Sequence, residues 1–316
     1  MRHLYSLDDL SLSGSCVSIG TFDGVHLGHQ EIIRQLVSLA QQKKLPAVVV
    51  TFFPHPDRVL GKKEGRFYLT TPEEKAEILG NLGVEIVITH PFNLEIADLS
   101  ASEFLQRLKE KIAFRTLVVG YDFALGKGRE GTVDRLAALS QPFDYELHVI
   151  PPVRINGEVV SSSLLRLLLG EGNIQKVNQL LGRPFSLSGT VIQGDGRGRT
   201  LGIPTANLDI LAERAVPLHG VYVCHAIVNH QRYGAVVNVG VRPTFENEPV
   251  APRVEAHLLD FEADLYQEKL SLEFLGRLRE ERRFASKDAL VEQIQQDILQ
   301  ARQILNAIVS DRKSEG

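Results

Sequence analysis

The stretch CVSIGTFDGVHLGH, residues 16–29, decides the fold of the first half of the chain. Residues 16–20 are typical of a strand buried on both faces, and a helix-period segment at 29–41 follows the glycine-rich turn. A buried strand that runs through such a turn into a helix is the opening unit of a doubly wound sheet, where the turn is the usual phosphate-binding corner. The stretch therefore predicts an α/β domain with a nucleotide site at the end of its first strand.

The same alternation of β-branched runs and helix-period segments continues to about Ile150. We expect further strands at 47–53, 84–89, 116–120 and 145–150, and further helices at 72–81, 101–112 and 132–139. Two of these helices carry start signals. Thr71 precedes a proline, and Ser100 precedes Glu103 by three residues. The first domain, residues 1–182, is predicted to be a doubly wound parallel sheet.

The pattern changes after about residue 183. Strand-like runs follow one another with no helix between them, at 185–193, 219–228, 232–239, 253–260 and 269–275. They favour an antiparallel β-barrel, with a sandwich as the alternative. Ser286 then caps a predicted C-terminal helix with apolar residues at spacings of three and four, so one face is expected to pack on the barrel: Leu290, Ile294, Ile298, Ala301 and Leu305. Residues 183–316 form the second predicted domain.

Composition excludes several classes of protein. The 316 residues carry 35 Lys and Arg against 39 Asp and Glu, a net charge of −4, which gives no broad basic field for a nucleic acid or an anionic membrane. Cys16 and Cys224 are too few for a disulfide framework. No run approaches the roughly 20 apolar residues of a membrane span. We expect a cytoplasmic protein without nucleic-acid or membrane partners, and a homo-oligomer stays open.

The corner at residues 20–29 has the chemistry of a polyphosphate site. Gly20, Gly24 and Gly28 let the backbone come close to a ligand, and His26 and His29 stand three apart at a helix start. Both imidazoles can therefore face the end of the helix dipole where negative charge is favoured. This suits a triphosphate that is attacked at its α-phosphorus and loses pyrophosphate, with charge stabilised as it builds on the phosphate oxygens.

Two other interpretations of this corner stay open. The turn can be a tight connection with histidines on the surface. A zinc site is disfavoured, because H-E-x-x-H is absent and Cys16, inside the strand, is the only cysteine nearby.

A second candidate site is GTVIQGDGRGRTLGIPTAN, residues 189–207. It lacks the G-K-[ST] of a Walker loop, but its glycines can let several backbone N–H groups converge on phosphate oxygens: Gly194, Gly196, Gly198 and Gly202. Thr205 and Asn207 are two apart, so in extended chain both face one way and can offer oxygen atoms to Mg²⁺. A simple turn beside Pro204 is the alternative.

The first half resembles the adenylyltransferase module of bacterial FAD synthetases. GTFDGVHLGH matches the signature G-x-F-D-G-x-H-x-G-H, and TFFPHP at 51–56, GYDFALGKGREG at 120–131 and SSSLLR at 161–166 look like the family's later motifs. The resemblance implies catalytic roles for His26 and His29. It implies ATP contacts at Gly20, Phe22, Asp23, Gly24, Gly28, Asp122, Ser162 and Arg166, and a flavin near Pro54, His55, Pro56 and Phe123. Leu125 departs from the family's usual aromatic, and Ser163 from its threonine.

The second half resembles riboflavin kinases. LGIPTAN is followed in order by GVYV at 220–223, NVGVRPTF at 238–245, VEAHLLDF at 254–261 and LREERRF at 278–284. The resemblance makes Glu255 the general base on the ribityl 5′-hydroxyl, with Arg242 and Arg279 as candidate flavin contacts. The alternative for Glu255 is a strand carboxylate that faces solvent.

Together the halves resemble the bifunctional prokaryotic riboflavin kinase/FAD synthetase family. The resemblance implies that riboflavin and ATP give FMN, that FMN and a second ATP give FAD and pyrophosphate, and that both steps need Mg²⁺. Two other functions stay open: an adenylyltransferase for a different phosphorylated substrate, and a flavin-binding or regulatory protein without turnover. An active enzyme is favoured because five residues that such proteins would lose are all present: His26, His29, Thr205, Asn207 and Glu255.

Overall fold

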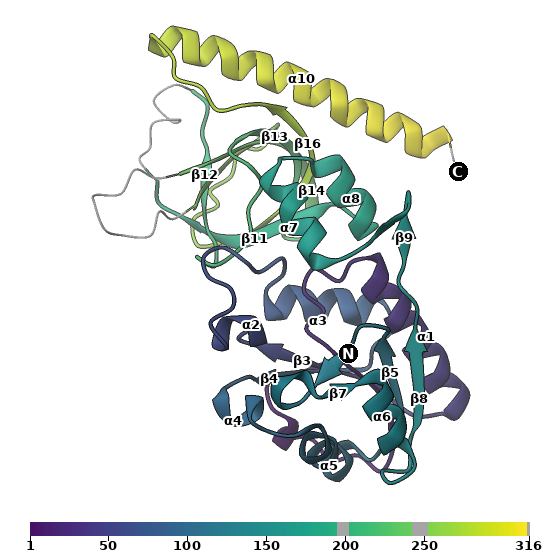
Figure 1. Cartoon of the computed structure of the whole chain (residues 1–316). Helices are drawn as coiled ribbons and strands as arrows, with labels where there is room; N and C mark the ends of the chain where they lie inside the picture. Colours follow the sequence, from purple (N-terminus) through teal and green to yellow (C-terminus); the bar gives the residue numbers. More distant parts are fainter. Residues whose placement is uncertain (195–201, 242–251, 315–316) are drawn as a thin grey trace. The chain divides into compact units, whose positions relative to one another are not determined.

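The computed structural model describes residues 1–194, 202–241 and 252–314 (Figure 1). The chain divides into two compact units, Met1–Ser162 and Ser163–Gly316. Three residues of the predicted sites lie outside the described residues: Gly196, Gly198 and Arg242.

The first unit is built on a parallel sheet, as predicted, with six strands where five were expected. Its strand order is β1-β4-β3-β2-β5-β8. The bounds are β1 Arg2–Leu4, β2 Ser15–Ile19, β3 Ala47–Phe53, β4 Ile86–Pro91, β5 Phe114–Gly120 and β8 Glu146–Ile150. The strands that were not expected are β1 at the sheet edge and two short hairpins, β6 Ala124–Leu125 with β7 Gly131–Thr132 and β9 Arg154–Ile155 with β10 Glu158–Val159.

Helices cover both faces of this sheet, which explains why its strands are continuously apolar. Val17 and Val48 pack with α5 (Ala101–Ile112) and α6 (Val133–Ser140), whereas their neighbours Cys16 and Val49 pack with α1 (Leu27–Lys43) and α3 (Pro72–Asn81). Both predicted helix starts are confirmed as capping boxes: Thr71 with Glu74, and Ser100 with Glu103. The shorter helices are η1 Leu7–Asp9, α2 Pro56–Val59, α4 Leu94–Ala97 and η2 Lys127–Arg129.

The second unit is a closed antiparallel barrel of order β11-β12-β15-β14-β13-β16, so the barrel prediction is confirmed over the sandwich. The bounds are β11 Phe185–Ile192, β12 Ala206–Asp209, β13 Gly220–Val228, β14 Gln231–Val241, β15 Pro252–Leu258 and β16 Lys269–Arg279. Two helices come first, α7 Ser162–Gly170 and α8 Ile174–Leu181. The Asn178 side chain on α8 accepts a hydrogen bond from the Phe185 N–H (2.8 Å) and donates to the Phe274 carbonyl (2.8 Å), so α8 is fixed to the barrel.

The long helix α10, Lys287–Ser314, lies along the barrel (Figure 1). Ser286 caps it as expected, accepting the Ala289 N–H at 3.2 Å. Ala301 is fully buried, and together with Ile298 and Leu305 it packs against Val221 and other barrel residues, which confirms the predicted apolar face.

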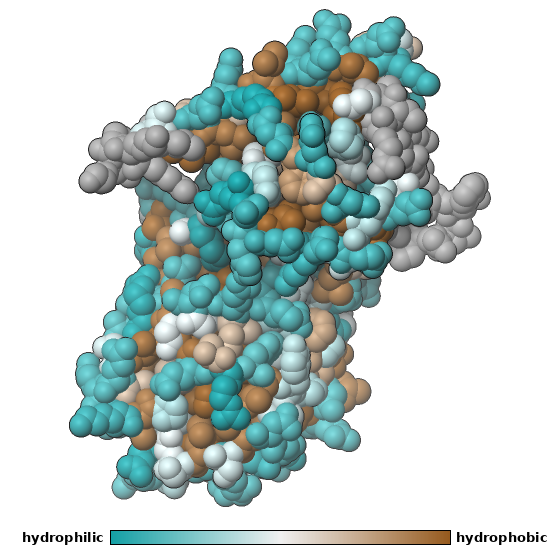
Figure 2. Space-filling model, turned by 180° about the vertical axis from the view of Figure 1, so that it is seen from behind, coloured by the Kyte–Doolittle hydropathy of each residue, from teal (hydrophilic) through white to brown (hydrophobic). Residues whose placement is uncertain are grey.

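Hydrophilic side chains dominate the outer surface seen from behind, and apolar ones show through in patches (Figure 2). Among residues 1–194, 202–241 and 252–314, no helix combines the length and the apolarity that a bilayer crossing needs.

Candidate active sites

The loop between β2 and α1 is a strained turn in the first unit. Phe22 and Val25 take positive φ angles of 47° and 40°, and Gly24 has φ 82°. Phe22 and Val25 are buried, at 3% and 0% exposure. Positive φ is costly for residues with a β-carbon, and such conformations persist only where surrounding contacts fix them.

Asp23 supplies one set of these contacts. Its carboxylate accepts the backbone N–H groups of Leu69 (3.0 Å) and Thr70 (3.1 Å) and the Thr70 hydroxyl (3.2 Å). The Gly24 N–H in turn donates to the Thr70 hydroxyl at 3.1 Å. Asp23 is 1% exposed, so its carboxylate ties the loop to residues 69–70. Its predicted contact with ATP stays a prediction.

Lys75, on α3, supplies a second set of contacts to the loop. Its Nζ donates to the Thr21 carbonyl at 2.6 Å and to the Thr51 hydroxyl at 3.1 Å. Burial disfavours the ammonium and lowers the Lys75 pKa to about 8, against the opposing effect of the Asp23 carboxylate. Lys75 was not predicted as a site residue, because a lysine after two glutamates near a helix start is typical of a solvated helix face.

The two histidines of the loop lie together, as predicted. His26 is the N-cap of α1, and its Nδ1 accepts the His29 N–H at 3.3 Å. The two rings are stacked, with centroids 3.6 Å apart and planes at 17°. Because Nδ1 of His26 accepts, the neutral ring carries its proton on Nε2 as a donor. A β-carbon at Gly28 would lie 3.1 Å from the His26 ring, a tight contact that glycine avoids.

The later motifs of the first unit come to the same corner in part. The Ser162 hydroxyl donates to the Asp23 carbonyl at 2.8 Å, which places the start of SSSLLR against the loop. Asp122 follows β5, and its carbonyl accepts from the Arg129 guanidinium at 3.1 Å. Arg166 lies on α7 in the second unit, and its approach to the ATP phosphates stays a prediction.

Of the predicted flavin residues, His55 lies in an aromatic cluster beyond β3. The His55 ring packs edge-on against Phe67, with centroids 4.8 Å apart, and the His55 N–H donates to the Tyr68 hydroxyl at 3.0 Å. His55 also caps α2, directly after Pro54 and before Pro56. Phe67 and Tyr68 were not singled out from the sequence. Phe123, by contrast, packs partly against the hydrophobic core that α5 covers.

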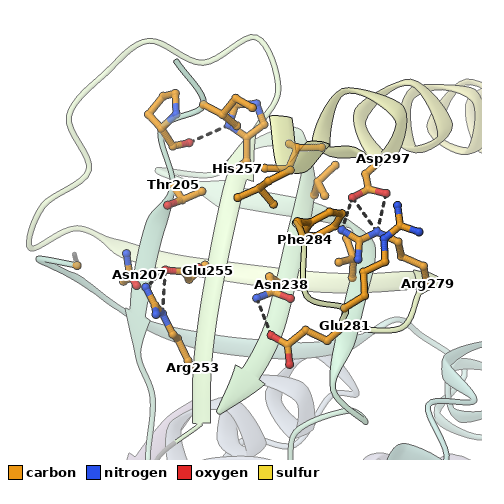
Figure 3. A pocket seen from close by; sticks show the side chains of 18 of the residues that line it. Thr205, Asn207, Asn238, Arg253, Glu255, His257, Arg279, Glu281, Phe284 and Asp297 are labelled. Atoms are coloured by element: carbon orange, nitrogen blue, oxygen red, sulfur yellow. Dashed lines mark hydrogen bonds and ion pairs between the residues drawn. The ribbon is translucent and has the colours of Figure 1, made fainter. Parts of the chain in front are cut away.

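In the second unit, strand register brings the kinase candidates together. Asn207 on β12 is opposite Glu255 on β15, and Glu255 is opposite Asn238 on β14. Asn238 is opposite Val221, which is opposite Arg279 on β16. All five line a cavity of about 650 Å³ (Figure 3). Residues more than 70 positions apart thus form one row across the barrel.

The Glu255 carboxylate faces this cavity. Oε1 accepts from the Arg253 Nε at 2.9 Å and Nη2 at 2.5 Å. The side chains of both residues are mostly buried, at 20% and 25% accessible. The Asn238 amide donates to Glu281 at 3.3 Å on the other side. Asn238, Arg253 and Glu281 were missed, although the two-residue spacing of a strand places Arg253 on the same face as Glu255.

Thr205 and Asn207 line the same cavity, as their spacing predicts. A β-carbon at Gly194 would lie 2.1 Å from the Asn207 amide, so only glycine leaves room for that side chain. The Pro204 carbonyl accepts from the Nδ1 of His257 at 2.8 Å. Gly202 has φ 73°, a conformation that glycine favours. Across the described parts of the chain, no three His, Cys, Asp or Glu side chains group as metal ligands.

Arg279 connects the barrel to α10 at the rim of the cavity. Its guanidinium forms hydrogen bonds of 2.7–3.0 Å with the Asp297 carboxylate, which is 2% exposed. The Arg279 guanidinium also lies 5.7 Å from the Phe284 ring. Asp297 and Phe284 were not expected from the sequence. The predicted flavin contact of Arg279 stays a prediction.

Comparisons with known proteins match both halves of the chain. A family model described as FAD synthetase matches residues 9–164, and one described as riboflavin kinase matches residues 181–305. Bifunctional riboflavin kinase/FMN adenylyltransferases are similar along the whole chain. That of Bacillus subtilis (strain 168) is 37% identical over 303 residues, 94% of each chain. That of Pseudomonas fluorescens is 39% identical over 292 residues, 92% of each. That of Escherichia coli (strain K12) is 33% identical over 305 residues, 96% of each.

A solved structure shares the fold. It is titled a macrolide-efflux protein from Streptococcus pneumoniae, is 32% identical and has a TM-score of 0.84, with 95% of this chain and 98% of that chain covered. The efflux named in that title refers to the Streptococcus pneumoniae protein. Because the two family models together span most of the sequence, this chain belongs to the bifunctional riboflavin kinase/FMN adenylyltransferase family.

Proposed function

We propose that this chain makes FAD from riboflavin in two ATP-dependent steps, one in each unit. The second unit transfers the γ-phosphoryl group of ATP to riboflavin and gives FMN and ADP. The first unit transfers the AMP part of a second ATP to FMN and gives FAD and pyrophosphate. The observation that carries the proposal is the row Asn207, Glu255 and Asn238 in one cavity, from three strands that the riboflavin kinase model matches.

In the kinase step, Glu255 acts as the general base. The ribityl 5′-hydroxyl loses its proton to the carboxylate as its oxygen bonds to the γ-phosphorus, and the bond from that phosphorus to the ADP oxygen breaks. Both hydrogen bonds from Arg253 go to Oε1, so they fix the carboxylate and leave Oε2 to accept the proton. At Gly202 a β-carbon would meet nothing within 4 Å, which leaves room for the phosphates beside Pro204.

The donors at the phosphate end fit Mg²⁺. Thr205 offers a hydroxyl and Asn207 a side-chain carbonyl, which are the hard oxygen ligands that this cation takes. When bound with ATP, Mg²⁺ neutralises charge on the phosphate oxygens. Thr205 and Asn207 would hold the ion. Because Gly194 has no side chain, the Asn207 amide has the space that it occupies.

In the adenylyl step, the FMN phosphate attacks the α-phosphorus of ATP and pyrophosphate leaves. His26 and His29, at the N-terminus of α1, donate to phosphate oxygens as negative charge builds. The backbone of residues 20–24 approaches the phosphates, with Asp122, Ser162 and Arg166 as further contacts. The flavin lies against Pro54, His55 and Pro56, with Phe123 nearby.

The remaining expectations belong to the same proposal. The enzyme works in the cytoplasm on ATP, riboflavin and FMN, without nucleic-acid or membrane partners. A measurement of its mass in solution would show whether it is a monomer or a homo-oligomer. The boundary between the adenylyltransferase and the kinase domains lies between residues 182 and 183.

The test follows the flavins over time. Purified protein is incubated with riboflavin, ATP and Mg²⁺, and the products are separated by chromatography. FMN is expected first and FAD later, and a chelator of Mg²⁺ should stop both. A protein that binds riboflavin without converting it would be a flavin-binding protein. Adenylylation of another phosphorylated compound in preference to FMN would point to the other adenylyltransferase function.

A further inference from the structure

Lys75 is a buried cation that neither reaction step uses. It is 6% exposed, whereas Glu73 and Glu77 on the same helix are exposed, and its ammonium lies beneath the loop of residues 20–29. An ammonium without water around it is unfavourable unless its surroundings compensate it. Here they do so with the Thr21 carbonyl, the Thr51 hydroxyl and the charge of Asp23.

The bonding pattern shows what the lysine adds. The Thr51 hydroxyl already donates to the Thr21 carbonyl at 2.9 Å, so this carbonyl has a partner without Lys75. The ammonium adds a shorter, charge-assisted bond of 2.6 Å to the same oxygen. Lys75 therefore connects Thr21 to α3, and Asp23, two residues further along the chain, is bound to residues 69–70. The strained Phe22 lies between these two ties.

We propose that Lys75 is a positioning residue for FMN adenylylation: it holds the Thr21 carbonyl and thereby fixes the loop whose backbone and imidazoles receive the ATP phosphates. This inference rests on the proposed function of the first unit. The physical reason is that donors stabilise a transition state well only when they are in place before the reaction. A buried positive charge beneath the loop also favours the polyphosphate electrostatically.

The test compares Lys75→Met, Lys75→Gln and a matched control, Lys109→Met. Lys109 also donates its ammonium to backbone carbonyls of the first unit, those of Phe114 (2.7 Å) and Asp144 (2.6 Å), but away from the loop. For each full-length variant, kcat and KM are measured for FMN adenylylation. The riboflavin kinase rate of the same sample reports whether the rest of the chain is intact.

Lys75→Met is expected to lower kcat for adenylylation on the order of 10-fold or more, towards the roughly 100-fold that a 1 Å misplacement can cause. Lys75→Gln should recover part of this loss, because its amide can still donate to Thr21. Lys109→Met and the kinase rate should not change. A Lys75→Met enzyme with wild-type kcat, or an equal loss in Lys109→Met, would overturn the inference.

The wild-type pH profile gives a second measurement that does not depend on how the variants fold. The groups that act electrostatically on Lys75 are the Asp23 carboxylate in the loop and His3 on β1. As pH rises past about 8, the ammonium loses its proton, so adenylylation should decline while the kinase rate does not follow it. A flat profile from pH 7 to about 9.5 contradicts the inference. A wild-type enzyme with no adenylylation at any pH contradicts the proposed function instead.

Discussion

At the scale of single residues, His257 shows how a side chain can act through its neighbour. A carbonyl oxygen only accepts hydrogen bonds, so the contact with Pro204 fixes the His257 proton on Nδ1. Pro204 directly precedes Thr205, the proposed magnesium ligand. The imidazole therefore orients the P-T-A-N segment from β15, two residues from Glu255 on the same strand face.

A pair of substitutions tests this role. In His257→Asn the amide nitrogen lies close to the position of Nδ1 and can donate to Pro204, whereas in His257→Gln it lies farther out. His257→Gln should raise the KM of the kinase for Mg²⁺-ATP about 2- to 10-fold, the effect of losing a hydrogen bond of about 0.5–1.5 kcal/mol. His257→Asn should stay near wild type. If both variants raise KM equally, the Nδ1 contact is not what matters.

Lys75 also predicts a pH dependence of stability. The pKa is lowered from 10.5 to about 8 by burial, which corresponds to roughly 3 kcal/mol of cost for the folded, charged form. Between pH 8 and 10.5 the unfolded chain binds more protons than the folded chain at this site, so the contribution of Lys75 to stability rises with pH over that window.

Hydrogen exchange measures this effect in the full-length protein. The protection of amides in β2 and β3 should rise from pH 8 to 10 in the wild type, relative to Lys75→Met, after correction for intrinsic exchange. The difference between the two proteins below pH 8 should be constant. If the protection of the wild type relative to Lys75→Met keeps falling as the pH drops below 8, the Lys75 side chain is already neutral in the folded protein at pH 7.

At the scale of elements, apolar packing and the buried ion pair of Arg279 with Asp297 hold α10 on the barrel. The Asp297 side chain is 3% accessible and that of Arg279 is 19%, so this pair is shielded from solvent. Phe284, Leu290 and Ile294, just before and within the start of α10, line the cavity. The position of α10 therefore shapes the kinase site, although the helix supplies none of the proposed reacting groups.

Asp297→Ala should destabilise the second unit by about 3–5 kcal/mol, because it leaves the Arg279 guanidinium buried without its carboxylate. Kinase activity should fall with it. Arg302→Ala is the control, because it breaks an exposed ion pair between Arg302 on α10 and Asp260 in the turn after β15, and it should change little. Hydrogen exchange of the β13 and β16 amides during urea unfolding measures the stability of the second unit in the two variants. Equal effects would mean that burial of the pair is unimportant.

At the scale of the whole molecule, the two compact units have separate cores, and Arg166 is the one proposed adenylylation contact that belongs to the second unit. Independent cores allow one site to be disabled without unfolding the other. Glu255→Gln keeps the size of the side chain and its contact with Arg253 but removes the base. It should lower FMN formation roughly 100- to 10,000-fold and leave FAD synthesis from supplied FMN unchanged.

His29→Ala should have the opposite effect. Adenylylation is expected to fall roughly 100- to 1,000-fold, the usual cost of removing a transition-state donor, while FMN still forms. FMN should then accumulate from riboflavin. A loss of both activities in either variant, with the circular dichroism of the wild type, would show that the two sites do not act separately.

The sequence by itself determined the alternation of strands and helices in the first unit, the change to strands after residue 183, and the helix caps at Thr71, Ser100 and Ser286. These features depend on local backbone preferences and on hydrophobic periodicity, which neighbouring residues set. Motif order was enough to assign the family. The short strand β12 was not predicted, because its stability comes from pairing with distant segments. Helix α8 was also missed, although Asn173 caps its start and Gly182 its end.

Only the tertiary structure decided which side chains meet. Asn238 and Glu255 become neighbours through the register of β14 with β15, and Lys75 comes beneath Thr21 because α3 packs on the sheet next to the loop. Such contacts join residues 17 to 54 positions apart along the chain. No local pattern marks them, because a buried lysine and a solvated one have the same letter until the fold removes the water around one of them.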